Sequence, residues 1–363
     1  MIVEYPYLVT GLFVLCTLGF SILVNRLLLK FAKGFGIRGF EKHQEIRWSE
    51  ENKPSLGGLS FYMVFLTSFV AYTILASETA AKISNKEVLA FFTACTMGFI
   101  IGLADDAYNT NPRLKLLGQI ICGNLLVAGD IVIVLTPVLA INYLATVFWV
   151  VLIMNAINLL DNMDGVAGGI SIPILLGGLG FVLIDEKWEE SSIYYFMLAG
   201  MVAGVIGFLV YNWRPARMYM GDTGSQFLGV FLAGIAILFF WNPVEKENSL
   251  FHVKQLIIPA MFFILPLIDT ITVVLRRFLA GKSPFIGGRD HTTHALAVTG
   301  LGEKSVAIIF VTLSTIAGGL VFWFSNSGLK WDVWAISGFT LFWLLIFSGF
   351  QWIYKIGKRK VNK

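Results

Sequence analysis

The sequence Asn-Ala-Ile-Asn-Leu-Leu-Asp-Asn-Met-Asp-Gly, at residues 155–165, lies between two apolar runs, 145–154 and 170–184. It places amide and carboxyl side chains at the end of an expected membrane helix: Asn155, Asn158, Asp161, Asn162 and Asp164. Carboxyl groups at the edge of a hydrophobic helix are costly unless they meet water, a cation or one another. A polar turn between two helices would explain this stretch if it stood alone, because turns favour Asn, Asp and Gly. It is one of several such clusters, and the others argue for a function.

The composition predicts an integral membrane protein. Of the 363 residues, 56% are hydrophobic and 14% are charged, whereas soluble proteins contain about 25% charged residues. The polar segments are too short for a separate soluble domain, so we expect one membrane-embedded domain over residues 1–363. The first apolar run, 8–29, lacks a basic leader and a cleavage site, which predicts a retained helix. Membrane lipids are expected partners, and nucleic acid is not.

The lengths of the apolar runs predict an all-α, polytopic fold with about eleven membrane-spanning helices, since a span needs roughly 20 apolar residues. The runs are approximately 8–29, 56–75, 88–103, 116–134, 139–160, 166–184, 193–211, 224–240, 255–275, 306–324 and 334–354. Lys and Arg gather in the loops of one side, at 26–53, 113–115, 214–217, 276–304 and 355–363. Because cytoplasmic loops carry the excess of basic residues, we expect the N-terminus outside and the C-terminus inside. Every polar cluster then falls on the cytoplasmic face.

Two clusters follow the third predicted span. Asp105 and Asp106 are adjacent, and helical spacing would bring Asn109 over both. Adjacent carboxylates repel, so we expect a cation or a shared proton beside them. Lys115 and Gln119 follow one helical turn apart, and a cation with an amide suits phosphate oxygens beside a metal ion. A solvated pair of acids at a helix end is the plain alternative for the two Asp residues.

Two more clusters lie further along the chain. Asp222 precedes a predicted membrane helix, where it could cap the helix or bind a metal through one oxygen. The other runs from Asp269 to the segment Arg289-Asp-His-Thr-Thr-His294. His291 and His294 are three residues apart and could share one face of a short helix. That spacing suits zinc, but no cysteine accompanies them, so we favour hydrogen bonds to a diphosphate.

Together the clusters predict phosphoryl transfer. Carboxylate-rich sites suit Mg²⁺ or Mn²⁺ bound between phosphates, and the metal and the basic side chains neutralise the charge of the reacting groups. The acceptor would reach such a site from the bilayer, as a lipid phosphate does. An ion-coupled transporter is the alternative from a different functional class, but the acidic residues of a transporter should lie near the bilayer midplane. A structural scaffold has no need of polar clusters gathered on one face.

The order of the motifs resembles the polyprenyl-phosphate N-acetylhexosamine-1-phosphate transferases, of the glycosyltransferase family 4 type. The motifs are Asp105-Asp-x-x-Asn, Asn155-x-x-Asn-x-x-Asp-x-x-Asp-Gly, Met220-Gly-Asp-x-Gly-Ser and Arg289-Asp-His-x-x-His. The resemblance extends from Lys53-Pro-Ser-Leu-Gly-Gly58 to His294. It implies transfer of a sugar phosphate from a UDP-N-acetylhexosamine to undecaprenyl phosphate, with Mg²⁺, at the cytoplasmic (inner) membrane, and release of UMP.

The resemblance also implies roles for individual residues. It makes Asp222 the first magnesium ligand, with a share for Asp106. The residues expected in catalysis are Asp105, Asp106, Asp161 and Asp164. The residues expected to bind substrate are Lys115, Asn155, Asn158, Asn212, Arg289, His291 and His294. For the mechanism we favour a single displacement in which an acid of the 105–106 pair activates the lipid phosphate, and a covalent aspartyl-phosphate route is the rival.

The loop around His291 bears on the sugar donor. The branch of the family that uses UDP-MurNAc-pentapeptide typically shows three consecutive His, and that run is absent. The UDP-GlcNAc branch often shows His-x-His-His, and here Thr293 replaces the third residue. Pro266-Leu-Ile-Asp-Thr270 followed by Arg276-Arg277 looks more like the UDP-GlcNAc branch, so UDP-GlcNAc is the expected donor. UDP-MurNAc-pentapeptide and other UDP-N-acetylhexosamines stay open, and the apolar helix faces allow a homodimer.

Overall fold

The computed structural model describes residues 6–32, 53–75, 85–185, 188–242, 253–279, 281 and 291–361. These residues form helices joined by short loops, with one isolated parallel bridge between Ser55 and Tyr219. The helices are α1 (Pro6–Phe31), α2 (Gly57–Leu75), α4 (Asn85–Tyr108), α5 (Pro112–Ala128), α6 (Leu139–Leu160), α7 (Val166–Ile184), α8 (Trp188–Asn212), α9 (Gly221–Ala236), the π-helix η1 (Ile237–Trp241), α10 (Lys254–Phe262), α11 (Ile264–Leu279), α12 (Thr292–Val298), α13 (Glu303–Asn326) and α14 (Val333–Val361). The predicted all-α, polytopic membrane fold is confirmed.

Nine helices in the described part of the chain are long and apolar enough to cross a membrane. The pair α10 and α11 forms one further candidate that bends by 86° between Phe262 and Ile264. The predicted span 116–134 corresponds to α5, which has only 17 residues. The exact number of spans and the direction of insertion stay predictions.

The predicted span 116–134 is too long because α5 ends at Ala128. Asp130 has a positive φ of 65°, which breaks the helix. The extended segment that follows satisfies its backbone through side chains: Asn142 accepts from the N–H groups of Leu135 and Thr136, each at 3.0 Å. Buried backbone groups need such partners outside a helix, so the segment is held in place without one.

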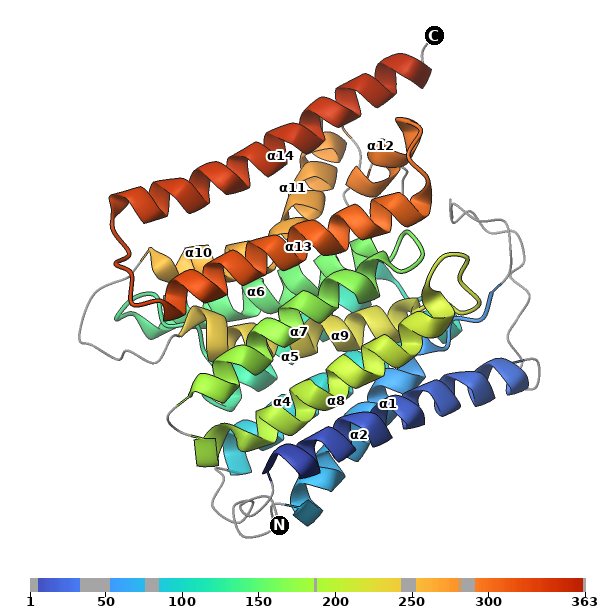
Figure 1. Cartoon of the computed structure of the whole chain (residues 1–363), viewed down its shortest axis with the longest axis vertical. Coiled ribbons are helices and arrows are strands. Elements are labelled where there is room, and N and C mark those ends of the chain that lie inside the picture. Colours follow the sequence, from blue (N-terminus) through green and yellow to red (C-terminus); the bar gives the residue numbers. More distant parts are fainter. Residues whose placement is uncertain are drawn as a thin grey trace.

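Helix α9 forms the centre of the bundle (Figure 1). With η1 it makes a candidate span of which 89% is buried, and it packs against α4, α6 and α2. Beyond its polar first turns α9 is apolar on every side, and such a helix is expected to be buried. At the opposite extreme, only 6% of the α14 span is buried, although side chains such as Phe339 and Trp343 pack partly against the core.

Glycines allow α2 and α4 to come very close to the start of α9. A Cβ added to Gly58 would lie 2.2 Å from the backbone nitrogen of Gly224, and one added to Gly102 would lie 2.2 Å from the carbonyl oxygen of Asp222. No larger residue fits at such distances, and small residues permit close approach of membrane helices. The first turn of α9 is therefore clamped between two other helices.

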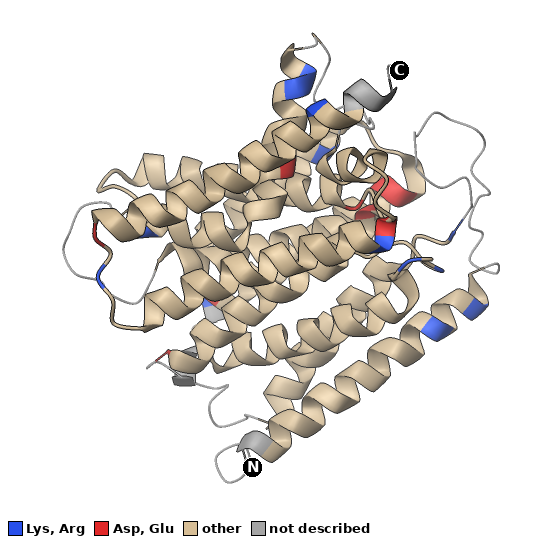
Figure 2. Cartoon of the chain, turned by 45° about the horizontal axis from the view of Figure 1, so that its top comes forward, with Lys and Arg blue, Asp and Glu red and all other residues tan. Residues whose placement is uncertain are grey.

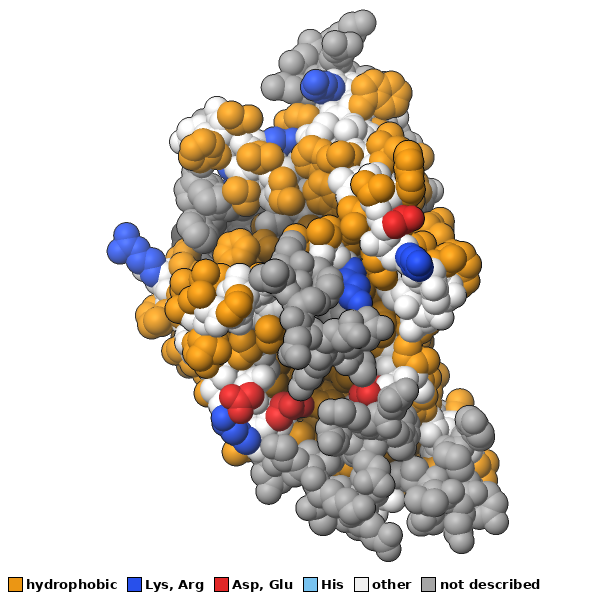
Figure 3. Space-filling model, turned by 90° about the vertical axis from the view of Figure 1, so that its left-hand side faces the viewer, with side chains coloured by type: hydrophobic (Ala, Val, Ile, Leu, Met, Phe, Trp, Pro, Cys, Tyr) orange, Lys and Arg blue, Asp and Glu red, His pale blue; other side chains and the backbone are white. Residues whose placement is uncertain are grey.

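Helix ends that carry polar residues meet at one end of the bundle. The C-terminal ends of α4 and α6 and the N-terminal ends of α5 and α9 lie there, with α12 and the start of α13 beside them (Figure 1). Charged residues are concentrated toward the ends of the helices, and their central stretches are almost free of them (Figure 2). The face seen from the left of Figure 1 is largely hydrophobic, with scattered charges (Figure 3).

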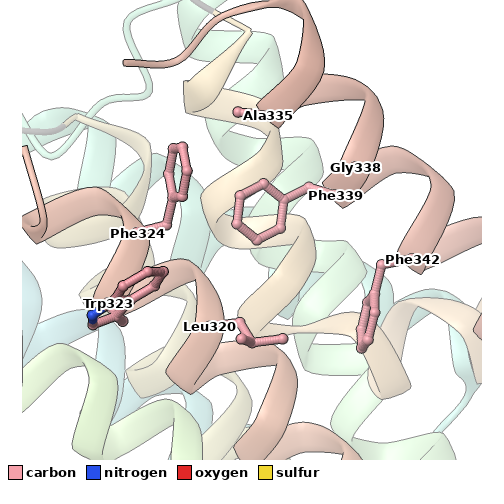
Figure 4. Close-up of a pocket in the computed structure, with 7 residues that line it drawn as sticks. All are labelled: Leu320, Trp323, Phe324, Ala335, Gly338, Phe339 and Phe342. Carbon is pink, nitrogen blue, oxygen red and sulfur yellow. The ribbon is translucent and has the colours of Figure 1, made fainter. Parts of the chain in front are cut away.

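A cavity of about 310 Å³ lies between α13 and α14 (Figure 4). Its lining is wholly apolar: Leu320, Trp323, Phe324, Ala335, Gly338, Phe339 and Phe342. Leu320 is 17 residues along α13 from Glu303, which places it about 25 Å from the polar end at 1.5 Å per residue. The cavity is therefore separate from the polar residues described next.

Candidate active site

Asp105, near the end of α4, is held by two different partners. Its Oδ1 accepts hydrogen bonds from the backbone N–H and the hydroxyl of Thr110, at 2.9 and 2.6 Å. Its Oδ2 accepts from Nζ of Lys115 at 2.7 Å. Asn109 has a positive φ of 49° and ends the helix, so the expectation that it would lie over the two acids by helical spacing is wrong. Thr110 occupies that position because the chain turns back at Asn109.

Asp106 faces the opposite way and caps α9. Its Oδ1 accepts from the backbone N–H of Asp222 at 3.0 Å. Its Oδ2 accepts from the N–H and the hydroxyl of Thr223, at 2.8 and 2.6 Å. A carboxylate at this position satisfies N–H groups that have no partner within the helix and compensates the helix dipole. Asp106 therefore caps α9, the role considered for Asp222. The side chain of Asp222 does not serve as the cap and can make other contacts.

Asp222 lies at the meeting point of three helices. Its Oδ1 accepts from Nζ of Lys115 at 2.5 Å and from Nδ2 of Asn158 at 2.6 Å. Lys115 therefore bridges Asp105 and Asp222, with 16% of its side chain exposed. Among the described residues nothing donates to the Oδ2 of Asp222, and a quarter of this side chain is exposed, at 25%. The predicted cation beside the acids is Lys115.

A second layer of polar side chains lies one helical turn deeper. Gln119, Asn155 and Gln226 are separated from Lys115, Asn158 and Asp222 by four, three and four residues. Asn155 donates to Gln119 at 2.7 Å, and Gln119 donates to Gln226 at 2.9 Å. All three helices are thus linked at both levels, which fixes their register beneath the charged residues.

Asp164 and Asn212 are engaged in holding the loop between α8 and α9. The Oδ2 of Asp164 accepts from Arg214 at 3.1 Å and from the N–H of Ala216 at 3.0 Å. Arg214 also pairs with Glu303 at 2.7 Å. Asn212 is buried and connects the N–H of Gly165 to the carbonyl of Met218 through its amide, at 3.0 and 2.8 Å. These contacts place the two residues beside the site in a supporting position.

The two histidines lie at the start of the short helix α12, with ring centroids 5.7 Å apart. Nδ1 of His291 lies 2.9 Å from the Oδ2 of the buried Asp269 on α11. The hydroxyl of Thr293 donates to Asn162 at 2.7 Å, which ties α12 to the polar stretch after α6. The expectation that the His pair shares one short helix is thus close to the structure, although His291 is the residue that precedes the helix.

The structure brings most of the predicted residues to one end of the bundle. Asp161 ends α6 there as its C-cap residue. Arg289 lies outside the described residues. The sequence reasoning missed Thr110, Thr223 and Gln226 as partners of the predicted residues. The spacing of four residues from Asp222 could have indicated Gln226, since residues four apart share a helix face.

The donor set fits a magnesium ion at Asp222 better than a closed metal cage. Among the described residues no group of three or more His, Cys, Asp or Glu side chains is arranged to hold a metal. Mg²⁺ in phosphate-transfer sites is usually held by one or two carboxylates, with waters and substrate phosphates as the other ligands. The Oδ2 of Asp222, on a side chain that is partly exposed, satisfies that requirement, whereas both oxygens of Asp106 already accept hydrogen bonds.

Three relatives are similar to this chain over most of its length. A probable undecaprenyl-phosphate N-acetylglucosaminyl 1-phosphate transferase of Bacillus subtilis is 29% identical over 81% of this chain and 78% of its own. A phospho-N-acetylmuramoyl-pentapeptide-transferase of Wolinella succinogenes is 28% identical over 71% of this chain and 77% of its own. A decaprenyl-phosphate N-acetylglucosaminephosphotransferase of Mycolicibacterium smegmatis is 26% identical over 78% of this chain and 75% of its own.

The model of glycosyl transferase family 4 matches residues 88–240. This segment runs from α4 through α9 and contains Asp105, Asp106, Lys115, Asn158 and Asp222, which the fold brings together. The ordered motifs and the names of the three relatives agree with that match. The chain is therefore similar to glycosyl transferase family 4 over residues 88–240, and to the three transferases over most of its length.

Proposed function

We propose that this protein transfers N-acetylglucosamine-1-phosphate from UDP-GlcNAc to undecaprenyl phosphate in the cytoplasmic membrane and releases UMP. The observation that carries the proposal is the bridge formed by Lys115 between Asp105 and Asp222, with Asn158 on the same oxygen of Asp222. It joins acids, a cation and an amide at the end of a membrane bundle, where a lipid phosphate and a soluble nucleotide can meet. The names of two relatives, from Bacillus subtilis and Mycolicibacterium smegmatis, support the sugar.

The reaction is a displacement at phosphorus. An oxygen of the lipid phosphate forms a bond to the sugar-bearing phosphorus, and the bond from that phosphorus to the bridging oxygen breaks. UMP leaves with the electron pair, so atoms and charge balance without a further reactant. The demand on the protein is to position two anionic substrates and to offset their charge. Lys115 supplies a positive charge to phosphate oxygens, and the amide of Asn158 holds Asp222 in place beside it.

The two adjacent acids take different parts in this proposal. Both carboxylate oxygens of Asp106 accept hydrogen bonds from the start of α9. This favours Asp105 as the acid that orients the lipid phosphate. Asp222 would hold Mg²⁺, with Mn²⁺ as a substitute, through its available oxygen. When bound, the metal ion would offset negative charge on the diphosphate. Asp161, Asn155 and His294 would contact the nucleotide-sugar or support residues that do.

The sugar donor can be identified by testing different UDP-sugars with the purified protein and Mg²⁺. UDP-GlcNAc, UDP-GalNAc and UDP-MurNAc-pentapeptide would be supplied separately, with and without undecaprenyl phosphate, and UMP and the lipid-linked sugar would be measured. We expect equal amounts of both products from UDP-GlcNAc, only when lipid is present. Products from UDP-MurNAc-pentapeptide, as the name of the Wolinella succinogenes relative suggests, would keep the chemistry and change the sugar. Lipid-independent UMP would contradict a lipid acceptor.

The displacement itself is tested by leaving out the acceptor. Protein incubated with UDP-GlcNAc labelled at the β-phosphorus, without lipid, should carry no label after removal of the free nucleotide. A labelled protein that passes its phosphate to added lipid would replace the single displacement with a covalent aspartyl-phosphate route.

A further inference from the structure

Asp269 is completely buried, with 0% of its surface exposed, yet it carries a carboxyl group. A buried carboxylate is strongly unfavourable unless hydrogen bonds and a countercharge compensate it. All of the compensation shown in the structure comes from the start of α12. Oδ1 accepts from the N–H and the hydroxyl of Thr292, at 2.7 and 2.6 Å, and Oδ2 lies 2.9 Å from Nδ1 of His291.

These contacts bear on the protonation of His291. The backbone N–H of Thr292 can only donate, so Oδ1 of Asp269 is an acceptor, and an ionised Asp269 also accepts from Nδ1–H of His291 through Oδ2. The other ring nitrogen, Nε2, makes no hydrogen bond to the described residues and is not among the atoms sealed from solvent. The ring is therefore fixed on one side by Asp269 and open on the other.

The segment that carries the fixed ring contacts the polar stretch that follows α6. Thr293, two residues after His291, donates to Asn162 at 2.7 Å. Asn162 is four residues beyond Asn158, whose amide holds Asp222 at 2.6 Å. Thr293 thus attaches the segment that carries His291 to the chain leaving α6, close in sequence to a partner of Asp222.

We propose that Asp269 is a positioning residue that holds His291 as a doubly protonated ring, with Nε2–H presented to a phosphate oxygen of the nucleotide-sugar. The inference rests on the proposed function, because it takes a diphosphate as the ligand. The charge of Asp269 balances the imidazolium, and a charge-assisted donor binds a phosphate oxygen more strongly than a neutral one. Asp269 acts through His291 and does not touch the substrate itself.

Asp269→Asn tests this arrangement. The amide oxygen must stay with the two donors of Thr292, so the NH₂ group faces Nδ1 of His291. Nδ1 then has to accept, and the ring becomes neutral with its proton on Nε2. We expect kcat/KM for the UDP-sugar to fall about tenfold, because the hydrogen bond from Nε2–H to the phosphate remains but loses the assistance of the positive charge. Thr292→Val is the matched control: it loses the hydroxyl bond to Asp269 but keeps the Asp269–His291 pair, so kcat/KM should change less than about threefold.

A double-mutant cycle separates positioning from a purely structural role. If Asp269 acts through His291, Asp269→Asn should cause no further loss in a protein that already carries His291→Ala. The same fold-loss in both backgrounds, or normal activity in Asp269→Asn, would overturn the proposal. Melting temperatures of all variants show whether each protein is folded.

A second readout needs no turnover. The chain has four histidines, and ¹⁵N-histidine NMR assigns His291 as the signal missing from His291→Ala. We expect Nδ1 and Nε2 both protonated in the unmodified protein and Nδ1 bare in Asp269→Asn. A bare Nδ1 or a bare Nε2 in the unmodified protein would overturn the proposal. Absence of UMP release from every UDP-sugar would contradict the proposed function instead, so the two failures are distinguishable.

Discussion

Asp105 and Asp106 are neighbours of the same type, and the structure predicts opposite responses to the same substitution. In Asp106→Asn, the single amide oxygen can serve either the N–H of Asp222 or that of Thr223. The other N–H then faces an NH₂ group in a buried environment, which costs about 1–3 kcal/mol. Loss of the negative charge at the start of α9 adds about 0.3–1 kcal/mol. We expect a total destabilisation of about 1–4 kcal/mol and a Tm lower by several degrees.

Asp105→Asn should behave differently. Its amide oxygen can remain with both donors of Thr110, and Lys115 keeps its contact with Asp222. We expect a Tm close to that of the unmodified protein, within about 1–2 °C for a loss below about 1 kcal/mol, while UMP release falls strongly. Thermal unfolding of the two purified variants in the same detergent makes the comparison. Equal melting temperatures, with equal losses of activity, would refute the assignment of Asp106 as the cap of α9.

Three other substitutions or conditions test separate parts of the account. Lys115→Met removes the cation between Asp105 and Asp222, so kcat/KM should fall at least about 100-fold, as expected when a buried charge pair is broken. Steady-state kinetics measure this loss. A loss below about tenfold would contradict a phosphate-binding role for Lys115. Gly102→Ala should prevent correct folding, because the added Cβ would lie 2.2 Å from the carbonyl oxygen of Asp222, whereas Gly338→Ala should be tolerated, because nothing lies within 4 Å of its Cβ. The yield of monodisperse protein after purification compares the two variants. Equal yields would show that α4 can move away from α9. Removal of divalent cations with EDTA should abolish UMP release and added Mg²⁺ or Mn²⁺ should restore it, so full activity in excess EDTA would exclude the proposed metal.

The sequence predicted the fold class and the convergence of the polar clusters, because both depend on gross properties. Long apolar runs allow little but membrane helices, and the polar stretches recur at alternate ends of those runs. Lys115 was correctly expected beside the two acids. These features depend on the type of residue and its position along a helix, which a sequence displays directly.

The sequence could not predict how neighbouring residues divide their partners. Asp105 turns to Lys115 and Asp106 to α9 because α4 ends at Tyr108 and Asn109 adopts a left-handed conformation. Such detail depends on contacts between α4 and α9, which are more than 100 residues apart in the chain. The end of α5 at Ala128 was missed for a similar reason, since the extended segment after it depends on Asn142 for its hydrogen bonds.

The most direct test of the central claim locates the chemistry at Asp222. Lipid-dependent UMP release from UDP-GlcNAc would be measured for the unmodified protein, Asp222→Asn and Asp130→Asn. Asp130 is an exposed acid that pairs with Lys86 at the other end of α5, and Asn tolerates its left-handed backbone, so it controls for loss of a charge. We expect normal release in Asp130→Asn and a loss of at least about 100-fold in Asp222→Asn, as for removal of a group that stabilises transition-state charge. Full UMP release by folded Asp222→Asn would contradict it.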